Sequence, residues 1–144
     1  MSILSSPASE ILAGLEEGTY TSTEVTQASL DSIASKDETV GAFITTNAEQ
    51  AIAKANEIDR KRQAGEPVGL MAGLPIALKD NMCTQGTRTT CASRMLENFV
   101  PPYDAHVTER LIAEDAIIVG KSNLDEFAMG SSTENSALQT TKNP

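Results

Sequence analysis

The sequence has no tryptophan, three phenylalanines and one histidine among its 144 residues. Aromatic residues make up only 3% of the chain while hydrophobic residues make up 40%, so any core is aliphatic and rich in alanine. Such a core favours helices packed on a sheet over a small aromatic barrel. Basic residues are also scarce, and the formal net charge is −9. Because phosphate contacts need clustered Lys and Arg, this balance argues against a nucleic-acid surface on this segment.

Long apolar runs are absent. No stretch approaches the roughly 18 apolar residues of a membrane span, and the start of the chain lacks the pattern of a secretion signal. We therefore expect a cytoplasmic protein. The two cysteines, Cys83 and Cys91, are too few for a disulfide framework, and their spacing matches no zinc motif. The sequence therefore predicts reduced thiols and no metal site.

A Ser-His-Asp triad is not expected either. It would have to use His106, the one histidine, and no Gly-x-Ser-x-Gly nucleophile elbow occurs in the sequence. His106 lies in the first turn of a predicted helix, with Asp104 and Glu109 nearby in no metal-site pattern. We interpret His106 as a surface or structural residue.

Residues 1–66 are predicted to be mainly helical, with one short strand over 42–46. Apolar residues recur at helical spacing over 8–15 and again over 48–55. The start signals of three helices are Ser6 with Pro7, a Thr21–Glu24 capping box and an Asn47–Gln50 capping box. Their expected ends are Gly18, about Ala34, and Gly65 with Pro67.

From residue 67 onward the pattern changes to strand, helix, strand. The apolar run 70–78 predicts a buried strand that contains Pro75 near its start. Asp104 then caps a fourth helix with apolar positions at Val107, Leu111 and Ile112, and 116–119 is too uniformly apolar for a strand with one wet face. Short links between these elements predict a parallel pair of strands and the α/β class.

Lys79 stands where the first of these strands runs out into a loop, followed by Asp80 and Asn81. α/β proteins often place functional side chains at such positions. A lysine can act as a general base there only if its pKa, ordinarily about 10.4, falls by roughly 3 units, which costs about 4 kcal/mol. Burial at the strand end could supply that shift. The alternative is a charged Lys79 paired with Asp80 or another carboxylate.

Two other motifs allow more than one interpretation. The hydroxyl-rich loop 130–136 can present backbone N–H groups to a carbonyl, but the same composition suits an ordinary turn. Residues 120–122, Gly-Lys-Ser, match the end of a phosphate-binding loop. The first glycine of that motif would fall on Asp115, and the residues between predict a strand, so we do not expect a nucleotide to bind here.

Several longer motifs resemble the amidase-signature family. The run 73–83, Gly-Leu-Pro-Ile-Ala-Leu-Lys-Asp-Asn-Met-Cys, is similar to the lysine strand of that family. Segments 86–93, 104–107 and 118–130 follow in the family's order and spacing. The resemblance covers nearly the whole chain and implies an α/β fold with a mixed, largely parallel sheet flanked by helices. Residues 1–144 would then be the N-terminal part of one amidase domain, with 67–144 starting its catalytic core.

The resemblance also implies a Lys–Ser–Ser triad in which Lys79 is the lysine. A serine with a cis peptide relays the proton and a second serine attacks the amide. Both belong to a Gly- and Ser-rich segment that starts just after an Asn-Pro like Asn143-Pro144, so we expect residues 1–144 alone to be inactive. The residues expected to line the substrate cavity are Met129, Gly130 and Ser131, and Ser131 and Ser132 match a pocket-lining loop rather than a nucleophile.

Segments 95–104 and 127–137 resemble the branch of this family that supplies ammonia to tRNA-dependent amidotransferases. That branch implies glutamine as substrate, partner B and C subunits, tRNA bound through a partner, and ATP with Mg used by a partner rather than by this chain. Asp115 departs from the glycine usual there; Asp tolerates a left-handed turn, so we expect small stability effects. The alternatives are a non-catalytic form that only binds partner subunits and another amide hydrolase of the family. We also expect exposed strand edges and apolar faces on the isolated chain.

Overall fold

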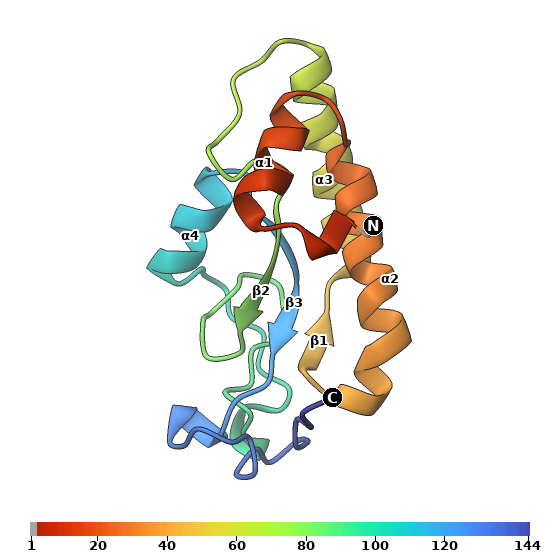
Figure 1. Cartoon of the computed structure of the whole chain (residues 1–144). Coiled ribbons are helices and arrows are strands. Elements are labelled where there is room, and N and C mark those ends of the chain that lie inside the picture. The colour runs from red at the N-terminus through yellow and green to blue at the C-terminus, as the bar shows by residue number, and fades with distance from the viewer. Residues whose placement is uncertain (1–2) are drawn as a thin grey trace.

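The computed structural model describes residues 3–144 and shows three strands with helices on both faces (Figure 1). The helices are α1 (Ala8–Glu16), α2 (Ser22–Val40), α3 (Ala48–Gln63) and α4 (His106–Ala113), and the strands are β1 (Phe43–Thr46), β2 (Pro75–Lys79) and β3 (Ile117–Ser122). Short 3-10 turns cover Ile3–Ser5, Arg94–Leu96 and Glu126–Ala128. Helices α2 and α3 cover one face of the sheet, and α4 lies on the other. The predicted α/β class is confirmed.

The sheet has the order β1-β3-β2. β2 and β3 are parallel, with Pro75 opposite Ile117 and Lys79 opposite Ser122, while β1 runs antiparallel to β3. The predicted parallel pair is therefore confirmed. Because the parallel strands point the same way, the loops that follow them, 80–104 and 123–144, gather at one end of the sheet (Figure 1). Within the described residues β1 and β2 are the edge strands of this sheet.

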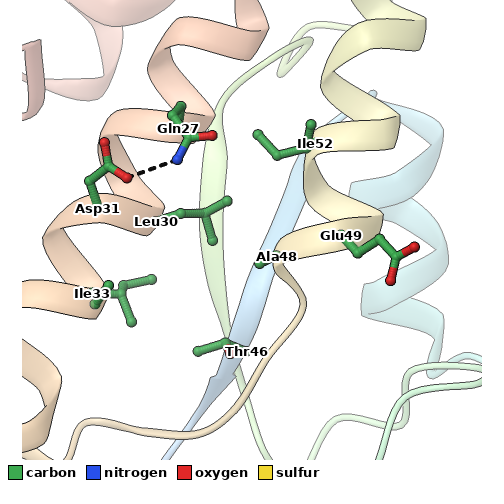
Figure 2. A pocket seen from close by; sticks show the side chains of 9 residues that line it. Gln27, Leu30, Asp31, Ile33, Thr46, Ala48, Glu49 and Ile52 are labelled. Atoms are coloured by element: carbon green, nitrogen blue, oxygen red, sulfur yellow. Dashed lines mark hydrogen bonds between the residues drawn. The ribbon is translucent and has the colours of Figure 1, made fainter.

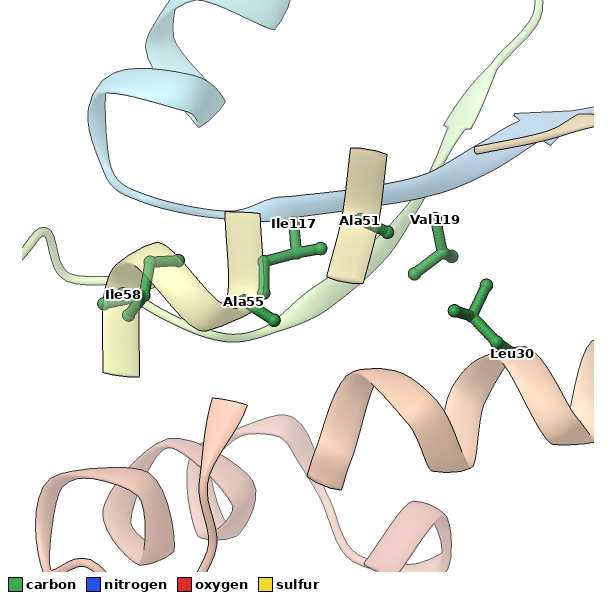
Figure 3. Close-up of a cluster of buried hydrophobic side chains, with 7 residues drawn as sticks. Leu30, Ala51, Ala55, Ile58, Ile117 and Val119 are labelled. Atoms are coloured by element: carbon green, nitrogen blue, oxygen red, sulfur yellow. The ribbon is translucent and has the colours of Figure 1, made fainter. Parts of the chain in front are cut away.

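The core is aliphatic and alanine-rich, as the composition predicted. Ile117 and Val119 of β3 point toward Leu30 of α2 and toward Ala51 and Ala55 of α3 (Figure 3). The small alanines let α3 approach the sheet closely, which a larger side chain would prevent. A second cluster comprises Ile11, Leu15, Val25 and Leu74, and it fixes α1 against the start of β2.

The capping box at the start of α2 is confirmed. The backbone N–H of Glu24 donates to Thr21 Oγ1 at 3.1 Å, and the backbone N–H of Thr21 donates to Glu24 Oε2 at 2.8 Å. The predicted end at about Ala34 is wrong, since α2 continues to Val40 and ends at Gly41, whose φ of 67° is left-handed. Residues 35–39 are polar, and nothing among residues 35–40 breaks a helix.

The other predicted caps are wrong. Neither α1 nor α3 has a side-chain cap: Pro7 rather than Ser6 precedes α1, and Asn47 is buried with its backbone N–H donating to Val119 of β3. Because Val119 takes the backbone N–H of Asn47, the Gln50 side chain cannot accept from it to complete a capping box. Helix α4 is preceded by Ala105, and the carboxylate of Asp104 instead accepts from the backbone of Gln85 at 2.7 Å.

Two apolar segments differ from the prediction. The strand expected over 70–78 begins only at Pro75, and Leu70 is 84% exposed in the turn before it. On α4 the structure buries Thr108 and leaves Val107 and Ile112 exposed, while Leu111, the third predicted apolar position, is half-buried. Thr108 turns inward because its hydroxyl donates to the carbonyl of Cys83.

Candidate active site

Lys79 is the last residue of β2, at the edge of the sheet where the loops gather. It lines a cavity of about 170 Å³ together with residues of the 123–133 loop. The lining residues are Lys79, Asn123, Leu124, Asp125, Ala128, Gly130, Ser131 and Thr133. The structure thus brings Lys79 together with two of the three residues predicted to contact substrate. The third, Met129, is 82% exposed and does not line the cavity.

The environment of Lys79 differs from the expectation in two respects. Its side chain is exposed, so residues 3–144 do not provide the burial expected at the strand end. Nor is Asp80 its partner, because successive side chains of a strand point to opposite faces and Asp80 turns inward to Lys121. The first difference reflects an open face of β2: Ala77 and Lys79 share that face and both are exposed, whereas Leu78 on the other face is buried.

Lys121 is the buried lysine of this site, and nothing in the amino-acid order marks it beyond the Gly-Lys-Ser triplet. It lies in β3 with no exposed surface, which confirms that 120–122 is strand rather than a phosphate-binding loop. Its Nζ donates to the carbonyl of Met82 at 2.6 Å and to the hydroxyls of Thr84 and Thr89, both at 3.0 Å. Burial lowers the pKa of Lys121, and the carboxylate of Asp80, 3.9 Å away, opposes that shift. The three acceptors match the three N–H donors of an ammonium.

Asp80 fixes the loop that follows Lys79. Its Oδ2 accepts from both the backbone N–H and the hydroxyl of Thr90, and its own backbone N–H donates to Ser122 of β3. The carbonyl of Asp80 accepts from Cys91 at 3.0 Å. Together with Lys121, these bonds hold loop 80–93 against the ends of both parallel strands, and so they fix the backbone on the C-terminal side of Lys79.

The 123–137 loop is organised around Asp125, which is 3% exposed. Its carboxylate accepts from three backbone N–H groups, those of Ser132, Thr133 and Asn135, each at 2.9 Å. The N–H groups of Thr133 and Asn135 in particular hold the pKa of Asp125 below its usual range. Phe127, Ala128 and Thr133 have left-handed backbone conformations. Non-glycine residues adopt that region rarely, so the loop has one specific and costly shape.

The two loops are also bonded to each other. The backbone N–H of Phe127 donates to Cys91 and that of Ala137 donates to Ala92, while the Ser93 hydroxyl donates to Glu126 at 2.6 Å. These contacts join the loop after β2 to the loop after β3. The cavity wall near Lys79 is therefore a connected structure rather than two independent turns.

The remaining candidates lie outside this site. Cys83 and Cys91 are free thiols, as predicted, and burial raises the pKa of Cys91. His106 is on the surface, 3.7 Å from Glu109, and no metal-binding cluster occurs within residues 3–144. Asp115 has the left-handed φ of 56° that was expected. Its carboxylate also pairs with Lys54 and Lys61 and accepts from Gly69, so it ties α3 to the start of β3.

A larger cavity of about 530 Å³ lies between α2 and α3, away from Lys79. Figure 2 shows Leu30, Ile33 and Ile52 directed toward it, with Gln27 donating to Asp31 at its rim. Its lining is mainly aliphatic, with acidic groups only at Asp31 and Glu49. It contains two carboxylates and the hydroxyl of Thr46 but no lysine. The smaller cavity at Lys79 is therefore the candidate active site.

The chain belongs to the Amidase family, whose sequence pattern it matches over residues 24–144. That match confirms the resemblance inferred from the motifs. Among the part of the chain that the structure describes, no helix is long and apolar enough to cross a membrane.

Particular relatives are similar in sequence and in structure. The chain is 60% identical over 122 residues to the A subunit of glutamyl-tRNA(Gln) amidotransferase from Thermosynechococcus vestitus, covering 85% of this chain and 25% of that protein. The crystal structure of the corresponding Thermotoga maritima protein matches with a TM-score of 0.68 and 40% sequence identity. The match covers 85% of this chain and 24% of that chain. The structure of the peptide amidase of Stenotrophomonas maltophilia matches with a TM-score of 0.81 and 34% sequence identity, covering 90% of this chain and 27% of that chain. The chain spans about a quarter of the length of these relatives.

Proposed function

We propose that this chain forms part of the glutaminase component of a glutamyl-tRNA(Gln) amidotransferase. The observation that carries the proposal is Lys79 at the end of β2, in one cavity with Gly130 and Ser131. The 60% identity over 122 residues to the Thermosynechococcus amidotransferase protein supports the choice of this branch of the family.

The reaction is hydrolysis of the side-chain amide of glutamine to glutamate and ammonia. In the proposed mechanism a neutral Lys79 accepts a proton through a relay serine, while a second serine attacks the amide carbon. The Lys79 ammonium then returns the proton to the departing nitrogen, which leaves as ammonia. Water hydrolyses the resulting acyl-enzyme ester and regenerates the serine. By resemblance, both serines follow Pro144.

This mechanism requires Lys79 to be less exposed than it is within residues 3–144. The free edge of β2 and the open side of the cavity are the surfaces that further chain would cover. Removing an ammonium from water disfavours its charged form and can lower a lysine pKa by about 3 units or more. We therefore infer that Lys79 becomes a competent base only when the rest of an amidase domain packs on this edge.

The proposal extends to partners. B and C subunits would receive the ammonia and use ATP with Mg to activate glutamate on the tRNA. Residues 120–122 belong to strand β3 and do not form a nucleotide loop, and the net charge of −9 is unfavourable for phosphate contacts. These observations support placing tRNA and ATP on a partner. A cytoplasmic location follows from the same proposal, because charged tRNA is used there.

The test is ammonia release from glutamine by an amidotransferase of the relatives' full length that carries this segment, assembled with its partner subunits. We expect Lys79→Ala to abolish the activity, a loss of at least about a thousandfold, because the base acts as one unit with the serines. Lys36→Ala, which removes an exposed lysine on α2, is the matched control and should leave turnover unchanged.

Two results would count against the proposal. One is substantial glutaminase activity in the Lys79→Ala enzyme. The other is turnover by the 144-residue chain alone, since that would require a nucleophile among its own serines.

A second candidate is hydrolysis of another amide. The peptide amidase superposes with a TM-score of 0.81, against 0.68 for the Thermotoga amidotransferase protein, although its sequence is less similar. Comparing kcat/KM for free glutamine with that for a C-terminal peptide amide distinguishes the two. A preference for the peptide amide would favour the second candidate.

A further inference from the structure

Resting on the proposed function, we infer that Asp125 is a positioning residue that sets the substrate-facing wall of the cavity opposite Lys79. The buried carboxylate does this by gathering the 130–135 backbone around itself. Its place in the fold, its contacts and the space around it support this role.

Asp125 is tied to the same strands that hold Lys79. It follows the end of β3 by three residues, and Ser122 at that end is the partner of Lys79 in the parallel register. Between them, Asn123 donates its backbone N–H to Ala42 and Leu124 is buried, so the backbone cannot swing freely. The position of Asp125 relative to Lys79 is therefore set by the register of the sheet.

The carboxylate in turn determines where the loop lies. Three backbone N–H groups donate to it, and the backbone of Gly130 packs directly against it. A Cβ at Gly130 would lie 2.6 Å from Cγ of Asp125, so no other residue fits there without displacement. Gly130 and Ser131 line the cavity beside Lys79. Through these contacts Asp125 holds them at a fixed separation from the lysine.

Proton transfer is not the role that this geometry supports. Backbone donors occupy three of the roughly four lone-pair sites of the carboxylate, and Gly130 covers its carbon. A base needs a free lone pair directed at the proton it accepts. The energy of the three bonds instead holds the costly left-handed residues of the loop in place.

The experiment measures kcat and KM for glutamine in the full-length assembled enzyme. Asp125→Asn places an NH2 group against backbone donors, so at least one of the three bonds is lost. We expect KM to rise about tenfold, with a much smaller change in kcat. Asp125→Glu keeps the charge but is one CH2 too long for the space beside Gly130, and we expect KM to rise similarly. Glu134→Gln is the matched control, since Glu134 is an exposed acid of the same loop, and its KM should not change.

Each other outcome overturns the inference. A folded Asp125→Asn enzyme with wild-type KM would show that the wall does not depend on the carboxylate. A collapse of kcat at constant KM would make Asp125 a proton-transfer group, and wild-type KM in Asp125→Glu would show that charge alone is needed. Loss of cooperative melting would assign Asp125 to folding. If the wild-type enzyme does not hydrolyse glutamine at all, the proposed function fails instead.

Discussion

Replacing Lys121 by methionine tests whether the buried ion pair stabilises the loop behind Lys79. Methionine approximates the length of the lysine stem but has no charge. The change removes three hydrogen bonds from Nζ and leaves the carboxylate of Asp80 buried without a counter-charge. In the wild-type structure Asp80 Oδ1 has no hydrogen-bond partner within residues 3–144, and the bonds from Thr90 to Oδ2 bring no positive charge.

The magnitude follows from the pair's geometry. Two unit charges 3.9 Å apart attract by about 4 kcal/mol at an effective dielectric constant of about 20. Breaking a buried pair by removing one partner usually destabilises by about 3 to 5 kcal/mol, because one charge is left unpaired. We therefore expect Lys121→Met to lower the free energy of unfolding by about 4 kcal/mol.

Adding Asp80→Asn to Lys121→Met removes the buried carboxylate charge that the single change leaves unpaired. The double variant should therefore recover about 1 to 3 kcal/mol relative to the sum of the single changes. Lys36→Met on the exposed face of α2 is the control and should change stability by less than about 0.5 kcal/mol.

The assay is pulse proteolysis in urea at sub-micromolar concentration, where exposed apolar faces cause least association. Additive single changes, with no recovery in the double variant, would refute the reasoning. A loss below about 1 kcal/mol for Lys121→Met would do the same, since it would mean that the charge contributes little.

Two further predictions concern stability. Because backbone donors hold the pKa of Asp125 below its usual range, its contribution is complete above the unfolded-state pKa of about 3.9 and is lost as pH falls through the lower folded-state value. Unfolding curves at pH 6 and pH 3 should therefore differ less in Asp125→Asn than in wild type; an equal difference would contradict this. Gly69→Ala would place Cβ well inside the van der Waals radii of the backbone atoms of Glu114. It should cost at least about 3 kcal/mol in urea unfolding, against about 1 kcal/mol for Gly18→Ala, which meets no atom within 4 Å; similar costs would show that Gly69 has room.

Much of the fold could be predicted because it depends on local signals. The alanine stripe of α3, the Thr21–Glu24 capping box and the apolar run of β3 each encode their element within a few residues. The predicted caps at Ser6, Asn47 and Asp104 failed for the opposite reason. A polar residue near a helix start has several possible partners: the Asp104 side chain and the Asn47 backbone N–H both bond to distant segments.

The site shows the same division. Lys79 at a strand end and the 130–131 loop could be selected from the sequence, but their convergence in one cavity depends on the parallel register of β2 and β3. Lys121 belongs to a triplet that only imitates a nucleotide motif, yet it is the fully buried lysine of this region. A strand pattern predicts that a residue is buried, but not which oxygens, from residues 32 to 39 positions away, will surround its ammonium.

The amino-acid order by itself determined the family, the α/β class and the parallel strands, because hydrophobic period and turn residues act over short distances. Only the tertiary structure decided which charges are buried and which carboxylate shapes the cavity, because those depend on contacts between loops far apart in the chain. The exposure of the Lys79 side chain depends on what packs against β2. Excluding water from an ammonium group disfavours its charged form.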